Sequence, residues 1–280
     1  MMENGEKLKI GILSDLHVDT NASILKRNES FADLIAELLK EKNVDLLLLA
    51  GDNSSEAFLS QKVNEEIKQK SGVDILFVPG NHDLWSLRNE ETDTEKLYRY
   101  FASREETLIA KPRILSDDWA VVGTAGWYDY GYGDQKHYSL EQFEKKQYRF
   151  AYWNDAHYIH WGKSDQEVAA EMLEQLEKDL QSVGSRQIIL VTHVATHPEF
   201  VVPLPNKIYN YFNAFLGSSS YEKLYRDYPI RYSIMGHVHL RKILKENDTT
   251  FVCACLGSKK HWTVKDARKE LERTLVTIDI

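Results

Sequence analysis

The sequence predicts an α/β fold built on parallel β-strands, and three observations support this prediction. Short apolar segments alternate with amphipathic segments at helical spacing through the N-terminal part of the chain. One apolar segment, residues 45–50, is rich in leucine without alternation, as expected for a strand buried on both faces. Each apolar segment runs into polar residues at its C-terminal end, the edge at which open α/β sheets bind ligands.

The first strand and the first helix are predicted within residues 7–43. Residues 7–14 form a β-like apolar segment. Ser30 and Asp33 then resemble a capping box, which begins many helices by satisfying free backbone N–H groups. Apolar residues at helical spacing follow, and Asn43 ends this helix.

Two more strands and a second helix give the order β-α-β-α-β. The strand over residues 45–50 runs into a Gly-Asp-Asn turn, and a helix follows over about residues 54–70. Gly72 closes that helix, and an apolar strand covers residues 73–78. Helical crossovers of this kind join parallel strands, so we expect these strands to be parallel.

The middle of the chain predicts two helices and the strand between them. A helix is expected between about residues 92 and 110, and an apolar strand over residues 119–124. Ser164 and Glu167 form a second capping box, which begins a helix that Gly184 closes.

The C-terminal part predicts strands of two kinds. Residues 187–192 and 231–235 are strongly apolar and end at His193 and at Gly236-His237-Val238-His239. The remaining segments alternate like antiparallel strands, over residues 242–245, 249–256 and 274–280.

Residues 126–162 differ from the rest of the chain because aromatic residues are frequent there and aliphatic ones are few. We expect an insertion or cap, since the segment is too short for a core of its own. Its rings would either stack on a base or another flat group, or pack the insertion against the sheet, and we favour packing. The aromatic residues are Trp127, Tyr128, Tyr130, Tyr132, Tyr138, Phe143, Tyr148, Phe150, Tyr152, Trp153, Tyr158 and Trp161.

Composition predicts a single domain over residues 1–280. The chain has 280 residues, 42% of them hydrophobic, which is enough for a full core. The start, Met1 to Lys9, is charged, and the next apolar segment stops at Asp15, so we expect no secretory signal. We also expect no membrane association, because no apolar run approaches the length that spans a bilayer.

Cysteine usage and charge suggest a location and a class of partner. Cys253 and Cys255 lie two apart in a predicted strand and share a face, where such neighbours rarely form a good disulfide. We therefore expect reduced core cysteines in a cytoplasmic protein. The net charge of −8 makes nucleic acid an unlikely partner. It does not exclude a small anionic substrate, because bound metal ions reverse the local field.

Five strands end in residues of metal-ligating type. In Gly236-His237-Val238-His239, alternate residues of an extended segment point the same way, so both rings can face one centre. Because the ends of parallel strands meet at one edge of a sheet, we expect a single site there. The residues are Asp15, His17, Asp52, Asn81, His82, His193, His237 and His239.

The ligand types favour two metal ions. Asp52 has two oxygens and can bridge both ions, whereas Asp15 and His17 would bind one ion and Asn81 the other. Mixed nitrogen and oxygen ligands suit Mn, Fe, Zn, Co or Ni, and the absence of thiolates argues against a structural zinc site. Two such ions, divalent or trivalent, would outweigh the carboxylate charge, so the site would attract an anion.

Taken together, these motifs resemble those of the calcineurin-like metallophosphoesterase superfamily. The resemblance covers residues 7 to about 258 but not the aromatic insertion. It implies a four-layer α/β/β/α sandwich of two mixed β-sheets flanked by helices. It also implies one ion on Asp15, His17, Asp52 and His239, and a second on Asp52, Asn81, His193 and His237. His82 would be the catalytic histidine, binding the substrate with Asn81 and protonating the leaving oxygen.

The sequence departs from the protein Ser/Thr phosphatases of this superfamily, so we expect a bacterial-type member. Those enzymes carry Arg where Pro79 stands, and a second Asp where Asn53, Ser54 and Ser55 follow Asp52. That missing Asp would have oriented the catalytic histidine. Asp83 would either take its place or cap the following turn, and we favour the cap.

The expected function is metal-dependent hydrolysis of a phosphomonoester or phosphodiester. A hydroxide bridging the two ions would attack in line, and His82 would act as general acid. The expected partner is a small phosphoester, possibly a nucleotide. Two alternatives are a non-catalytic metal-binding scaffold, disfavoured by the complete ligand set, and a nuclease, disfavoured by the acidic charge.

Overall fold

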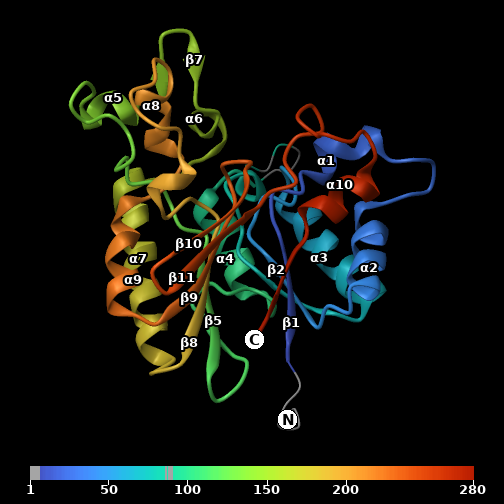
Figure 1. Ribbon diagram of the computed structural model, residues 1–280. Helices are drawn as coiled ribbons and strands as arrows, with labels where there is room; N and C mark the ends of the chain where they lie inside the picture. Colours follow the sequence, from blue (N-terminus) through green and yellow to red (C-terminus); the bar gives the residue numbers. More distant parts are fainter. Residues whose placement is uncertain (1–6, 86, 88–90) are drawn as a thin grey trace.

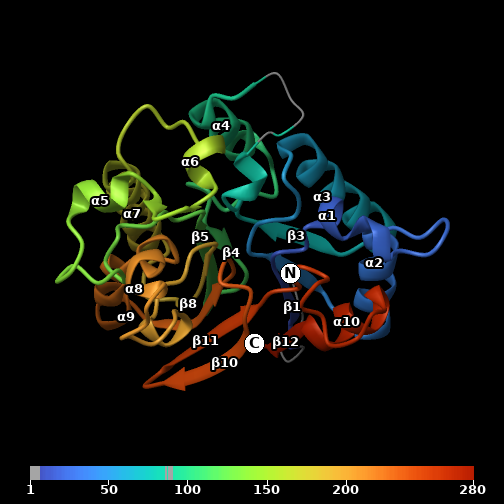
Figure 2. The same ribbon diagram turned by 90° about the horizontal axis from the view of Figure 1, so that it is seen from above.

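Two β-sheets lie face to face in the middle of the molecule, and helices cover the outer face of each (Figures 1 and 2). The structure is a computed structural model that describes residues 7–85, 87 and 91–280. Residues 1–6 of the charged start lie outside the described residues. Both sheets are mixed, which confirms the predicted four-layer α/β/β/α class.

The first sheet has the strand order β12-β1-β2-β3. Strands β1 (Lys9–Leu13), β2 (Leu46–Leu49) and β3 (Asp74–Phe77) are parallel, as predicted. Strand β12 (Val276–Asp279) pairs antiparallel with β1 and forms an edge. The C-terminal ends of β1, β2 and β3 therefore lie side by side.

Helices α2 (Phe31–Glu41) and α3 (Ala57–Ser71) cover the outer face of this sheet, as do the shorter α10 (Ala267–Thr274) and α4 (Thr94–Ser103) (Figure 2). The hydroxyl of Ser30 accepts the N–H of Asp33, as the first capping motif predicts. Gly72 ends α3 at φ 76°, a left-handed conformation that suits glycine.

The helix predicted between residues 92 and 110 is shorter than expected. It ends at Ser103, and Thr107 and Ile109 instead form isolated bridges to Phe77 and Gly123. Those two partners belong to different sheets, so this segment is extended because it pairs with both. Local helical spacing could not reveal these long-range partners.

The second sheet has the strand order β10-β11-β9-β8-β5-β4. Its central strands β9, β8 and β5 are parallel, and β4 and β10 form antiparallel edges. The strands are β4 (Arg113–Ile114), β5 (Trp119–Thr124), β8 (Gln187–Thr192), β9 (Ile230–Met235), β10 (Arg241–Glu246) and β11 (Thr249–Ala254).

The expectation of antiparallel C-terminal strands is only partly met. Strand β11 is antiparallel to β10 but parallel to β9, with Cys253 opposite Met235. After β9 the chain turns outward to β10 at the edge and returns between the two. The order β10-β11-β9 therefore places β11 in the same direction as β9.

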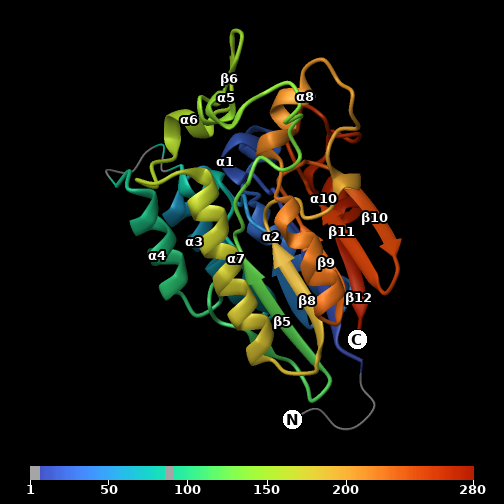
Figure 3. The same cartoon turned by 90° about the vertical axis from the view of Figure 1, so that its left-hand side faces the viewer.

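Helix α7 (Asp165–Ser182) lies on the outer face of the second sheet with the short α9 (Leu224–Asp227) (Figure 3). The predicted capping box is present: the hydroxyl of Ser164 accepts the N–H of Glu167, and the Glu167 side chain accepts the N–H of Ser164.

Alternate strand residues divide the core into layers. Ile10 and Ile12 of β1 pack against Val121 and Val191 of the other sheet, between the two sheets. Residues of opposite parity face outward, where Leu47 packs with α2 and Leu190 with α7. Both faces of each central strand are therefore buried, as their continuous hydrophobicity indicates.

The aromatic segment lies above the C-terminal strand ends (Figure 3). It contains α5 (Leu140–Glu144), the hairpin of β6 (Gln147–Tyr148) and β7 (Ala151–Tyr152), and α6 (Asp155–Tyr158). Its rings pair mainly with one another and with helix α8 (Tyr209–Phe212) and Phe215.

We expect Ser164→Ala to lower the free energy of unfolding by about 1 kcal/mol, because the variant loses the side-chain cap of α7. Urea unfolding followed by circular dichroism measures this change. Ser182→Ala is the matched control on the same helix, because Ser182 lies at its C-terminal end and its hydroxyl bonds only to the carbonyl of Asp179. Equal losses in both variants would contradict the capping role.

Candidate metal centre

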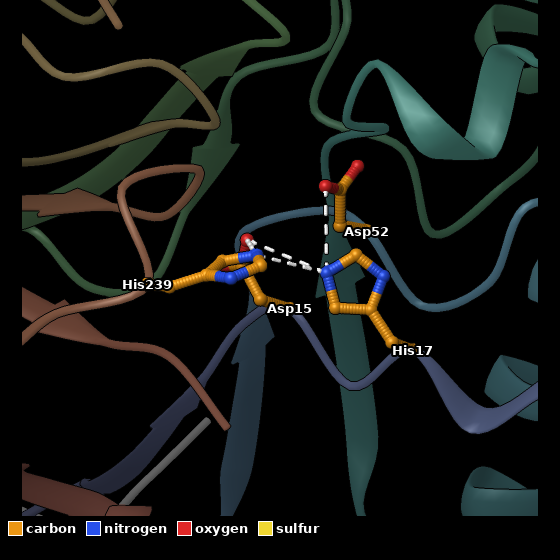
Figure 4. A group of neighbouring side chains, drawn as sticks. All are labelled: Asp15, His17, Asp52 and His239. Carbon is orange, nitrogen blue, oxygen red and sulfur yellow. Dashed lines mark hydrogen bonds and ion pairs between the residues drawn. The ribbon is translucent and has the colours of Figure 1, made fainter. Parts of the chain in front are cut away.

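The structure brings four predicted ligands together at the ends of β1, β2 and β9, and Figure 4 shows them converging. The Nε2 atoms of His17 and His239 are 3.0 Å apart, and His239 Nε2 is 3.3 Å from Asp15 Oδ1. Asp52 Oδ2 lies 3.8 Å from His17 Nε2. These four side chains form the first metal group: Asp15, His17, Asp52 and His239.

The other predicted ligands form a second metal group that shares Asp52 with the first. Asp52 Oδ1 is 3.4 Å from His193 Nε2, and that nitrogen is 3.2 Å from His237 Nδ1. The amide oxygen of Asn81 lies 3.1 Å from His193 Nε2 and 3.0 Å from His237 Nδ1. One oxygen of Asp52 therefore faces each group, as bridging two cations requires.

The histidine tautomers of the second group fit a metal ion. His193 Nδ1 lies 2.8 Å from the carbonyl of Ala50, and His237 Nε2 lies 2.9 Å from the carbonyl of Phe215. A carbonyl only accepts, so each of these nitrogens carries hydrogen, and the opposite nitrogen presents a lone pair when the ring is neutral. Those two lone pairs face each other at 3.2 Å. A cation between them removes their repulsion: in the metal-free site a proton on His193 does so, because the pKa of His193 is raised, and a bound metal ion would take the place of that proton.

Electrostatics also favours positive charge in this place. Burial opposes ionisation of Asp15 and Asp52, but neighbouring histidines outweigh it and hold the pKa of both carboxyls below the usual range. Burial likewise lowers the pKa of His193, yet the charge of Asp52 raises it to about 10. Buried carboxylates that stay ionised require a nearby cation.

Five of the seven predicted ligands adopt a left-handed backbone. This conformation is uncommon for residues other than glycine, and it clusters at functional sites. It turns each side chain back toward the common centre directly after its strand. The φ angles are 53° at Asp15, 43° at His17, 58° at Asp52, 67° at His237 and 52° at His239.

Two glycines allow the strand-end loops to approach closely. A Cβ on Gly80 would lie 2.2 Å from Asp52 Oδ1, and a Cβ on Gly51 would lie 2.6 Å from the backbone nitrogen of Gly80. Any side chain at either position would push Asp52 out of place.

Asp83 holds these loops together, which corrects the expected turn cap. Its carboxylate accepts the N–H groups of Gly80 and Asp52 at 2.7 Å and of Asn53 at 2.9 Å, and also the hydroxyl of Ser60. Burial and the charge of Asp52 raise its pKa to about 7, whereas these donors oppose the shift. The two backbone loops, rather than the following turn, are its partners.

His82 lies beside both groups without belonging to either. Its backbone N–H donates to Asp52 Oδ1 at 2.9 Å, and its ring stacks on Trp85 with 3.5 Å between ring centroids. Its Nδ1 is 3.5 Å from the hydroxyl of Ser55. Burial lowers the pKa of His82 to about 3, so the ring is neutral.

The structure adds one buried carboxylate that sequence reasoning missed. Asp155 accepts Nδ2 of Asn81 at 2.8 Å and Nε1 of Trp85 at 2.6 Å. Burial raises its pKa, and these donors oppose the shift. Only its position among tryptophans and tyrosines, which are potential donors, could have drawn attention to it.

A cleft of about 1060 Å³ opens over the metal groups. Asn81, His82, His237 and His239 line its floor. Residues 152–155 of the aromatic segment, the apolar residues 200–203 and residues 238–242 also line the cleft. The site can therefore receive a molecule larger than phosphate.

Comparison with known proteins identifies the family. The model of the calcineurin-like phosphoesterase family matches residues 8–241. The chain belongs to this family. It is therefore a phosphoesterase enzyme, as predicted. The family and the two Asp/His groups together support divalent metal ions in a dinuclear site.

Solved structures of similar fold include phosphoesterases. The phosphopantetheinyl hydrolase of Mycobacterium tuberculosis has a TM-score of 0.71 at 16% identity, covering 98% of this chain and 96% of that one. A dimetal phosphatase from Danio rerio has a TM-score of 0.51 at 13% identity, covering 88% and 86%. At these identities the likeness concerns the fold.

A curated relative is similar over a shorter region. An uncharacterized metallophosphoesterase of Helicobacter pylori is 34% identical over 84 residues. The match spans 29% of this chain and 21% of that protein. Within the described residues, no helix has the length and hydrophobicity needed to cross a membrane.

We expect Asp83→Asn to lower the free energy of unfolding of the metal-free protein by about 2–4 kcal/mol, because an amide N–H₂ would face backbone N–H donors. Urea unfolding in the presence of a chelator measures this. Asp179→Asn is the matched control, since Asp179 is also buried but accepts only from Gln175. A loss for Asp83→Asn no larger than that of the control would contradict the role in holding the loops.

Proposed function

We propose that this enzyme hydrolyses a phosphoester of a small organic molecule with two metal ions. The shared carboxylate of Asp52 carries the proposal, because each of its oxygens faces one of the two groups of nitrogen and oxygen ligands. Manganese, iron, zinc, cobalt and nickel all suit this ligand set. The open cleft above the ligands gives a substrate access.

When bound, the two ions would lower the pKa of a shared water to give the bridging hydroxide and would offset the charge of the phosphoryl oxygens. The protein's part is to hold its ligands without reorganisation. The carbonyls of Ala50 and Phe215 fix the tautomers of His193 and His237. Asp83 fixes the loop that carries Asp52.

We assign His82 as the general acid and, with Asn81, as a phosphate contact. The His82 ring lies on the cleft floor, within 4.8 Å of the His17 ring by centroid distance. A neutral ring donates one N–H to a phosphoryl oxygen, and the negative charge of a bound phosphate raises the ring pKa toward protonation. Such a residue contributes about 10²–10⁴-fold to the rate.

The size and the lining of the cleft support a proposal for the class of substrate. The volume of the cleft and the apolar residues 200–203 in its lining favour an ester with an extended organic arm over a nucleic acid, which the net charge of −8 also disfavours. The full-length similarity to a phosphopantetheinyl hydrolase makes phosphopantetheine esters one candidate. Nucleotides remain a second candidate. We also propose a cytoplasmic location, on the grounds of the two free thiols Cys253 and Cys255.

Metal removal and restoration test the reaction. We expect chelated protein to lose activity and to regain it with Mn²⁺, with two ions per chain by elemental analysis. Comparing p-nitrophenyl phosphate with bis-p-nitrophenyl phosphate separates monoesterase from diesterase. Protein that binds no metal would refute the proposal. Digestion of single-stranded DNA at a comparable rate would instead favour a nuclease.

Two substitutions separate metal binding from proton transfer. We expect Asp52→Asn to lose both ions and all activity, because each group loses its shared carboxylate. We expect His82→Ala to keep two ions and to lower kcat by about 10²–10⁴-fold. Elemental analysis and steady-state kinetics measure both effects.

The role of His82 as an acid has a sharper test. The loss in His82→Ala should be larger for an alkyl phosphate than for a p-nitrophenyl ester, whose leaving group departs without a proton. His137→Ala is the matched control, because His137 is exposed in the insertion and pairs only with Asp134. Equal losses on both esters would leave His82 as a binding residue only.

A further inference from the structure

Asp155 is the first residue of α6 in the aromatic insertion; it is fully buried and contacts the predicted ligand Asn81. Its Oδ1 accepts Nδ2 of Asn81 at 2.8 Å and Nε1 of Trp85 at 2.6 Å. Its Oδ2 accepts Nε1 of Trp153 at 2.8 Å and the hydroxyl of Tyr128 at 3.2 Å. One oxygen thus faces the site and the other faces the insertion.

The first contact selects the orientation of the Asn81 amide. A side-chain amide has one accepting oxygen and one donating nitrogen, and a half-turn exchanges them. Because a carboxylate only accepts, Asp155 holds Nδ2 and leaves Oδ1 facing His193 Nε2 and His237 Nδ1 at 3.1 and 3.0 Å. Only the oxygen of an amide is a metal ligand at such a site.

The second contact fixes the support of the His82 ring. The indole of Trp85 stacks on the His82 ring, at 3.5 Å between centroids, and also contacts the Tyr158 ring, at 4.7 Å. Its N–H is held by Asp155. The neighbouring carboxylate of Asp83 bonds to backbone groups and to the hydroxyl of Ser60 rather than to the His82 ring. The stacked indole supplies an orienting contact.

We propose that Asp155 is a positioning residue through which the insertion orients both Asn81 and, by way of Trp85, His82. The proposal rests on the proposed function, because it takes Asn81 as a metal ligand. It gives the insertion a task within the site besides packing. A variant lacking this carboxylate would keep the first metal group and weaken the second.

The experiment compares leucine variants at two buried aspartates of the same region. Asp155→Leu removes the acceptor of Asn81. Asp165→Leu is the matched control: Asp165 is also buried and accepts Nε1 of Trp127 and the hydroxyl of Tyr130, but it touches no predicted ligand. Chelated proteins are titrated with Mn²⁺ by calorimetry, and circular dichroism reports folding.

We expect Asp155→Leu to bind its first Mn²⁺ as the unmodified protein does and its second about 10–100-fold more weakly. Asp155→Asn keeps an accepting oxygen and should restore most of that affinity. Asp165→Leu should bind both ions normally. Normal binding of both ions by Asp155→Leu, or equal weakening by Asp165→Leu, would overturn the proposal.

If the leucine variants do not fold, two variants that each remove one hydrogen-bond donor to Asp155 test the proposal instead. Trp85→Phe removes a donor from Oδ1 of Asp155, and Tyr128→Phe removes one from Oδ2. We expect only Trp85→Phe to lower kcat, with two ions still bound, and equal rates would count against the proposal. Failure of the unmodified protein to bind two ions would refute the proposed function itself, which keeps the two failures distinct.

Discussion

The carboxylate of Asp83 is the contact on which the centre depends most. It joins the loop after β2 to the loop after β3 by accepting N–H groups from Asp52, Asn53 and Gly80. Both metal groups share Asp52, so a shift of this one loop would displace both. The glycines at 51 and 80 let the loops approach, and Asp83 keeps them there. The first sheet therefore builds the shared part of the site, and the second sheet supplies the histidines that complete it.

The α/β class and the sheet edge that carries the site could be predicted because buried parallel strands are recognisable from short stretches of sequence. The leucine-rich segment of β2 and the polar residues just after each strand are properties of short segments. The pairing of strands that are far apart in the sequence is not a property of any short segment. Residues 107–109 were expected to be helical because nothing nearby in the sequence identifies Phe77 and Gly123 as their partners. The direction of β11 was missed for the same reason, since alternation alone does not say which neighbour a strand has.

The structure brings the predicted ligands together, but the sequence contains little indication of the contacts that hold them in place. Asp83 is expected to cap a turn because its neighbours along the chain suggest one, yet two of its backbone partners, Asp52 and Asn53, lie 31 and 30 residues away. Asp155 belongs to none of the motifs on which the family resemblance rests, and no spacing connects it to Asn81. The left-handed backbone at five ligands has no signature either, because aspartate and histidine adopt it at only a small fraction of their positions, although more often than most residues do.

Each metal group draws side chains from both sheets: His239 joins Asp15 and His17, and His193 and His237 join Asn81. A bound ion would therefore act as a cross-link between the two halves of the sandwich. By mass action, a ligand that binds only the folded chain stabilises it by about 1.4 kcal/mol for each tenfold rise in free concentration above its Kd. The supply of metal in the surroundings would then govern how long the protein persists, as well as how fast it turns over substrate.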